Sequence, residues 1–117
     1  MISAMHSALS GVAAYAKQIE VSAHNVANVN TDGFKKSTTE LVSVESGGGR
    51  PVVRKDDSAG PTVLSDRGHG PTQVELSNVN LADEAVTQII AQRGFEATIS
   101  TLKTSDSMLG TILDMKR

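Results

Sequence analysis

Apolar residues recur with a helical period over the first part of the chain. They lie at steps of three and four, at Ile2, Met5, Leu9, Val12, Ala16, Ile19, Ala23 and Val26. Heptad spacing of this kind places the side chains in one narrow stripe along a helix. A narrow stripe suits a partner helix better than the broad face of a globular core. We expect the helix to end near Asn28–Gly33, because the residues leading to Gly33 favour a turn.

The end of the chain predicts a second long helix. Asn80 is a good N-cap, and Asp83 three residues later completes a variant of the capping box. A stripe with steps of four and three then comprises Leu81, Ala85, Gln88, Gln92, Phe95, Ile99, Leu102, Asp106, Leu109 and Leu113. Further apolar residues widen the arc, namely Val86, Ile89, Ile90, Met108 and Ile112. A wide apolar arc predicts more than one neighbour.

Two glycines lie inside this second helix, Gly94 and Gly110. Each costs roughly 1 kcal/mol relative to alanine in a helix interior. Close approach of another backbone is a reason to keep glycine at such a position.

The middle of the chain has a different pattern. Thr38–Val44, Pro51–Lys55 and Thr62–Leu64 are rich in threonine and valine and predict short strands. The glycines at 47–49 predict a turn, and 66–71 predicts a loop. We interpret this segment as small and irregular.

The predicted fold is therefore mainly α, with long N- and C-terminal helices paired as an antiparallel coiled-coil hairpin and a small irregular β segment between them. The divisions are 1–36, 37–75 and 76–117, which together form one structural unit. Aromatic residues make up only 3% of the 117 residues. Because rings supply much of the burial in small cores, we expect a partner to be needed for full order.

Charge and composition exclude several classes of protein. The net charge is −2 and the two signs are interspersed, so a nucleic-acid partner is not expected. No stretch approaches the ~18 apolar residues that predict a membrane span. Residues 1–16 contain no lysine or arginine, which is unlike a secretory signal. These features indicate the cytoplasm or an unconventional export route.

Candidate chemistry is sparse. His6 and His24 share a helix face but lie about 27 Å apart at ~1.5 Å per residue, so they cannot hold one metal ion. His69 lies between two glycines in the predicted loop. Asp56 and Asp57 lack the spacing of a calcium-binding EF-hand loop. We predict no enzymatic activity, no metal and no cofactor.

Both ends of the chain resemble the bacterial flagellar rod and hook proteins. Residues 23–36, AHNVANVNTDGFKK, are similar to the N-terminal motif of that family, with SALSG at 7–11 just upstream. The C-terminal motif resembles ELSNVNL at 75–81, AQRGFEA at 91–97 and TSDSML at 104–109. The chain departs from the usual pattern at His24 and Thr98, where asparagine is usual.

The resemblance implies a structural subunit of the flagellar rod that assembles into a helical tube through its terminal helices. Its partners would be copies of itself, other axial proteins and the flagellar type III export apparatus. Its location would be the basal body, reached without a cleaved signal peptide. Only about 45 residues separate the end motifs, which favours a short rod-type member. A hook-type protein, a divergent paralogue and a helical adaptor outside the filament remain alternatives.

The resemblance also implies roles for individual residues. Five would shape the end of the first helix: Asn25, Asn28, Thr31, Gly33 and Phe34. Ser77, Asn78 and Leu81 would begin the second helix, and Gln92, Arg93 and Phe95 would make packing contacts. Each residue also has a simpler interpretation within one chain, as a cap, a turn, a core residue or a surface charge.

Overall fold

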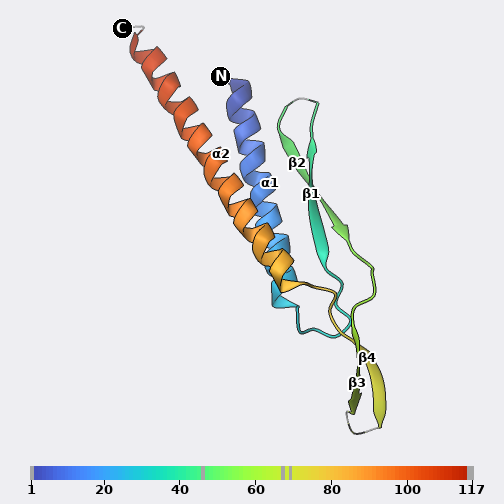
Figure 1. Ribbon diagram of the computed structural model, residues 1–117. Coiled ribbons are helices and arrows are strands. Elements are labelled where there is room, and N and C mark those ends of the chain that lie inside the picture. Colours follow the sequence, from blue (N-terminus) through green and yellow to red (C-terminus); the bar gives the residue numbers. More distant parts are fainter. Residues whose placement is uncertain (1, 46, 67, 69, 116–117) are drawn as a thin grey trace.

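The chain forms two long helices joined by two β-hairpins. The computed structural model describes residues 2–45, 47–66, 68 and 70–115, so His69 lies outside the described residues. In chain order the elements are α1 (Ile2–Ala27), β1 (Ser37–Ser43), β2 (Gly49–Lys55), β3 (Thr62–Asp66), β4 (Pro71–Glu75) and α2 (Leu81–Met115). The molecule is elongated, at 82 × 24 × 18 Å (Figure 1).

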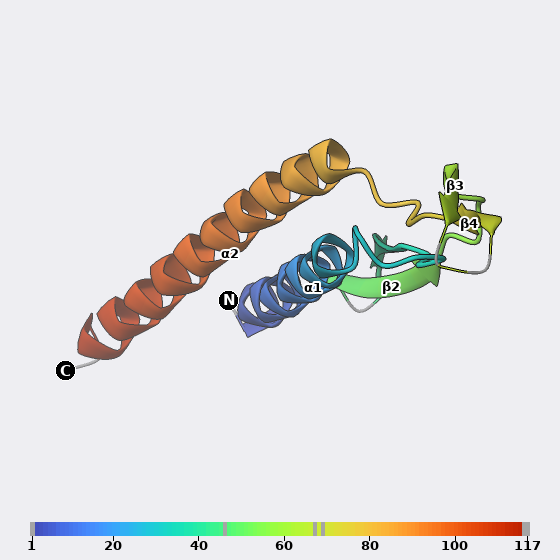
Figure 2. The same ribbon diagram turned by 90° about the horizontal axis from the view of Figure 1, so that it is seen from below.

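The two helices lie side by side and run in opposite directions (Figures 1 and 2). Near one end Ser22 Oγ donates a hydrogen bond to the backbone oxygen of Glu84, at 3.3 Å. Farther along, Gly94 lies beneath the ring of Tyr15. Because α2 has 35 residues and α1 has 26, the C-terminal end of α2 projects beyond the start of α1.

The buried residues of the helix pair are small or polar. Among the residues that the structure describes, the buried apolar ones are three alanines, Ala8, Ala14 and Ala91. The buried polar residues of the two helices are Ser22, Asn25, Glu84 and Ser105. Small side chains allow close helix packing but remove little apolar area from water.

The predicted apolar stripe of α1 is only partly covered. Ile2 is 71% exposed and Leu9 is 58% exposed, and Ala16 and Ala23 are exposed too. Met5, Val12, Ile19 and Val26 on the other side of the stripe are half-buried. The physical reason is that α1 has two neighbours, since it contacts α2 and also the β1–β2 hairpin. Its small residues lie between these neighbours, and part of the stripe faces solvent.

The β segment consists of two separate antiparallel hairpins. The first pairs Ser37 with Lys55 and Ser43 with Gly49, and it packs along α1. The second pairs Thr62 with Glu75 and extends beyond the ends of the helices where α1 ends and α2 begins (Figure 1). Strand β4 was not predicted, because its proline and glutamine give a weak strand pattern next to the glycines before it.

The tip of the first hairpin is hydrogen-bonded to α1. Ser10 Oγ accepts a hydrogen bond from the backbone N–H of Gly49, at 3.2 Å. Gly48 has φ of +91°, and a Cβ atom there would lie 2.1 Å from Ser10 Oγ. Glycine at the tip therefore permits both the turn and the close contact.

We predict opposite effects for one substitution at two positions of α2. A Cβ atom at Gly94 would lie 2.4 Å from the Tyr15 ring, whereas one at Gly110 meets nothing within 4 Å. Gly94→Ala should lower the free energy of unfolding by about 1–3 kcal/mol, the usual effect of overpacking. Gly110→Ala should raise it by up to about 1 kcal/mol, because alanine favours a helix.

Urea denaturation followed by circular dichroism measures both changes. Gly110→Ala is the control for the general effect of alanine in this helix. Equal stabilisation by both substitutions would show that the helices do not meet closely at Gly94.

Candidate assembly surface

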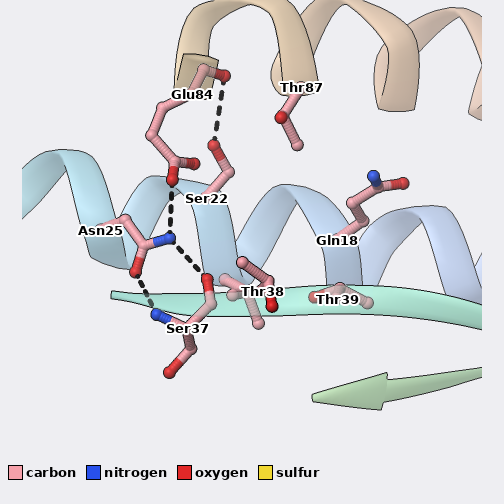
Figure 3. A pocket seen from close by; sticks show the side chains of 9 residues that line it. Gln18, Ser22, Asn25, Ser37, Thr38, Thr39, Glu84 and Thr87 are labelled. Atoms are coloured by element: carbon pink, nitrogen blue, oxygen red, sulfur yellow. Dashed lines mark hydrogen bonds between the residues drawn. The ribbon is translucent and has the colours of Figure 1, made fainter. Parts of the chain in front are cut away.

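Asn25 joins three parts of the chain through one side-chain amide. Its Nδ2 donates to the backbone oxygen of Ser37 at 2.7 Å and to Oε1 of Glu84 at 2.9 Å. Its Oδ1 accepts from the backbone N–H of Ser37 at 3.0 Å. Asn25 is only 1% exposed. The amide thus fixes the start of β1 and the first turn of α2 against the end of α1 (Figure 3).

Asparagine suits this position because its amide donates and accepts at once. The two bonds with Ser37 imitate those of a neighbouring strand, and a third bond remains for Glu84. Replacing it with a residue that only accepts or only donates leaves a buried group unpaired, and such groups are costly.

The residues after Asn25 end α1 by local hydrogen bonding. Asn28 Nδ2 donates to the backbone oxygen of His24 at 2.9 Å, and Thr31 Oγ1 donates to Asn28 Oδ1 at 3.2 Å. Gly33 has φ of +66°, the left-handed conformation expected of it. Its N–H donates to the backbone oxygen of Glu75 at 2.8 Å, which joins the end of α1 to β4.

Phe34 and His24 contact each other through their rings. The ring centroids lie 5.5 Å apart with an interplanar angle of 87°, which is an edge-to-face arrangement. This contact links the turn after α1 to the last turn of the helix.

Asn78 is a second amide that joins distant segments. Its Oδ1 accepts from the backbone N–H of Lys36 at 2.7 Å, and its Nδ2 donates to the backbone oxygens of Asp56 and Ser58. Its own N–H donates to the backbone oxygen of Phe34. These bonds bring three connecting segments together at one point just before α2.

Two further residues complete the entry into α2. Ser77 is buried, and its Oγ accepts from the backbone N–H of Val79 at 3.2 Å. Asn80 Oδ1 accepts from the backbone N–H of Ala82 at 3.0 Å, so Asn80 is the N-cap as predicted.

Ionic contacts support the same region. Lys35 Nζ donates to Glu75 Oε1, which also accepts from the backbone N–H of Gly60 at 2.7 Å. The Lys35 contact first, and then the Gly60 N–H, hold the pKa of Glu75 below its ordinary value. Hydrogen bonds from the backbone and the hydroxyl of Ser58 lower the pKa of Asp56 in the same way.

The helices expose a stripe of large apolar side chains on α2. Val86, Ile90, Met108 and Met115 are all exposed, and the spacing places them on one helical face. Ile89 and Ile112 are exposed on the two flanks of this face, whereas the exposed Leu113 lies on the opposite side of the helix. We call the six residues Val86, Ile89, Ile90, Met108, Ile112 and Met115 the α2 stripe. They form two apolar groups, one near the start and one near the end of α2, and exposed apolar groups of this kind mark interaction sites.

The remaining predicted contact residues lie on α2. Leu81 is exposed, as are Gln92 and Arg93. Gln92 and Arg93 both contact Glu96 on the following turn. Phe95 is half-buried. Sequence reasoning missed Glu84, which is buried despite its charge; its place one helical turn after the N-cap was the only signal.

The described residues do not assemble a metal centre. Across residues 2–45, 47–66, 68 and 70–115, no three His, Cys, Asp or Glu side chains gather as metal ligands would. In the same part of the chain, neither helix is both long enough and apolar enough to cross a bilayer.

An elongated helix pair with small buried residues and exposed apolar side chains is typical of proteins that associate with other chains. The family described as "Flagella basal body rod protein" matches residues 5–35, and the one described as "Flagellar basal body rod FlgEFG protein C-terminal" matches residues 72–115. The chain belongs to the flagellar basal-body rod and hook family.

Individual relatives agree with this membership. The chain is 33% identical to the flagellar basal-body rod protein FlgG of Borreliella burgdorferi over 86% of its length, which is 34% of that protein. It is 32% identical to FlgG of Bacillus subtilis over 75% of its length and 32% of that protein. A stretch of 44 residues is 50% identical to the flagellar hook protein FlgE of Treponema pallidum, covering 38% of this chain and 10% of that protein. The chain thus spans about a third of the rod relatives' length.

We predict that Asn25→Asp severely destabilises the protein. An ionised aspartate cannot donate to Ser37 or Glu84, and it places a second carboxylate against the first. The free energy of unfolding should fall by about 3 kcal/mol, as for other buried pairs that lose one partner.

The matched control is Asn30→Asp, which makes the same change at an exposed position. It should alter stability by less than about 0.5 kcal/mol. Chemical denaturation at neutral pH measures both variants, and similar values for the two would contradict the role given to Asn25.

We also predict an acid-dependent loss of stability from Glu75. Because its pKa is lower in the folded protein, its contribution is present above the ordinary value of 4.5 and is lost as pH falls through the folded pKa. Glu75→Gln should therefore reduce the loss of stability that occurs below pH 4.5.

The measurement is the melting temperature at several pH values for the protein and the variant. Glu45→Gln, at an exposed position, is the control. The idea fails if Glu75→Gln leaves the pH dependence as steep as it is in the unaltered protein.

Proposed function

We propose that this protein is a structural, non-enzymatic subunit of the bacterial flagellar rod, which assembles into a helical tube through its terminal helices. One observation carries the proposal: the fully buried residues of the helix pair are alanines and polar residues, while many of its large apolar side chains are exposed. A monomer with this arrangement has little apolar burial of its own and a strong tendency to associate.

Two different apolar surfaces support a head-to-tail assembly, in which one surface of each copy contacts the other surface of the next copy. One is the uncovered part of the α1 stripe, which includes Ile2, Leu9, Ala16 and Ala23. The other is the α2 stripe. When two unlike surfaces of one protein meet, the contact repeats from copy to copy, giving a ring or a helical array. We propose that the helices pack as coiled coils there, with α1 and α2 of one copy meeting those of others.

The same proposal gives roles to the exposed residues of the C-terminal motif. Leu81, Gln92 and Arg93 are outward-facing and available to neighbouring copies. Asn25, Asn28, Thr31, Gly33, Phe34, Ser77 and Asn78 act indirectly, since their bonds within the chain fix the angle at which the helices and hairpins leave the junction. Phe95 packs within the helix pair.

Family membership supports the rest of the proposed biology. Partners would include copies of this chain, other axial flagellar proteins and the flagellar type III export apparatus, with no nucleic acid and no membrane insertion. The protein would be located in the basal body and would be exported without a cleaved signal peptide. The three divisions of the chain, 1–36, 37–75 and 76–117, would act as one structural unit.

A hook-type role is the second candidate. It is favoured by the 50% identity to a hook protein over 44 residues, which exceeds the identity to the rod relatives. The rod is preferred because the matches to rod proteins cover far more of the chain.

Mass spectrometry of purified hook–basal bodies from the source organism tests the location. We expect this chain in stoichiometric amounts in the rod fraction after the hook is removed. Recovery only with the hook would support the second candidate. Absence from both fractions, with other rod proteins present, would contradict an axial role and favour an adaptor outside the filament.

Sedimentation velocity over a range of concentrations tests the assembly surface. We predict that Val86→Ser with Ile90→Ser weakens association at least tenfold, since losing two buried aliphatic contacts exceeds the roughly 1.4 kcal/mol that a factor of ten requires. Both positions are exposed, so the monomer should keep its fold.

The control is Val63→Ser with Leu64→Ser, an exposed apolar pair on β3. It should leave association nearly unchanged. An equal loss in both double variants would show that the α2 stripe is not the main contact.

A further inference from the structure

A polar cavity lies where α1, β1 and the start of α2 meet. Its volume is about 110 Å³. Eight of its lining residues are polar and one, Val21, is apolar; the polar ones are Gln18, Ser22, Asn25, Ser37, Thr38, Thr39, Glu84 and Thr87. Figure 3 shows these side chains contributed by three different elements.

Two buried oxygen atoms of the lining residues lack hydrogen bonds to any described part of the chain. They are Oε1 of Gln18, on α1, and Oγ1 of Thr39, on β1. A buried oxygen without a partner is costly, and such atoms in native proteins are normally satisfied by bound water. Both residues line the same cavity.

The carboxylate of Glu84 is a third group in this cavity with acceptor sites that need hydrogen-bond donors. It is buried in the wall of this cavity and receives one side-chain hydrogen bond, from Asn25. A carboxylate has about four acceptor sites, and a buried charge is tolerated only when these are well supplied. The N-terminal turn of α2 provides a favourable dipole but no side-chain donor.

We propose that the cavity binds a small cluster of ordered water molecules that links Gln18 and Thr39 to Glu84. The volume is several times the ~10–15 Å³ that a single water needs, and each water would find the two to four polar partners that hold internal water in place. The middle of the first hairpin is then joined to the helix pair through exchangeable water, whereas its base and tip are joined directly by Asn25 and Ser10.

A monovalent cation is the competing occupant. Glu84 is the only acidic residue that lines the cavity, and the other ligands would be neutral oxygens. The lone pairs of Glu84 and Gln18 Oε1 suit either occupant, but the hydrogen of the orphaned Thr39 hydroxyl also needs an acceptor, which water provides and a metal ion does not. Water is therefore favoured, and the cation is an outcome of the test.

The test is water-¹⁷O magnetic relaxation dispersion on the dilute monomer, which detects water molecules held for longer than the protein takes to tumble. We expect a clear dispersion in the unaltered protein, and a loss of at least half of its amplitude when Thr39→Val is combined with Gln18→Leu. Thr72→Val, which changes an exposed threonine in β4, is the control and should keep the full amplitude.

A second measurement does not depend on the variants folding. Water-to-amide magnetisation transfer in the unaltered protein should give a direct nuclear Overhauser effect at the amide of Thr39. No dispersion and no such effect would overturn the proposal. A dispersion that changes when sodium is replaced by a bulky organic cation would overturn it in favour of a cation site. Neither result depends on whether the protein joins a flagellum.

Discussion

Asn25 is the point at which the three parts of the chain meet, and its amide sets the geometry of the rest. The bonds to Ser37 hold the first hairpin along α1, and the bond to Glu84 holds the first turn of α2 against the end of α1. Both restraints come from one buried side chain, so the directions of the hairpin and of α2 are coupled. Asn78 restrains the connecting segments just outside this point.

The other constraint is the size of the residues between the helices. Gly94 lets the Tyr15 ring lie on the backbone of α2, and alanines and serines fill much of the remaining contact. Where the backbones approach this closely, only small side chains fit between them. Larger apolar side chains are half-buried at the edges of the contact or exposed on the outer faces.

The sequence predicted the two helices, their order and three of the four strands, because these depend on local periodicity and turn residues. The caps at Asn80 and Gly33 could also be predicted, since capping is local chemistry.

Which side of α1 is buried was harder to predict. Its apolar stripe marked one face, but the first hairpin also packs on α1, and the buried side moved toward small residues such as Ala8 and Ala14. Strand β4 has a weak pattern and depends on its pairing with β3. The buried Glu84 could not be predicted, because its partner Asn25 is 59 residues away.

Tyr15 is the only tyrosine, and the chain has no tryptophan. The near-ultraviolet absorbance and intrinsic fluorescence of the protein therefore arise mainly from one ring, which lies in the contact between α1 and Gly94. The ring's emission depends on how dry and how crowded its surroundings are. The molecule thus carries a built-in optical reporter of helix separation, readable without a dye as copies come together or as the helices part.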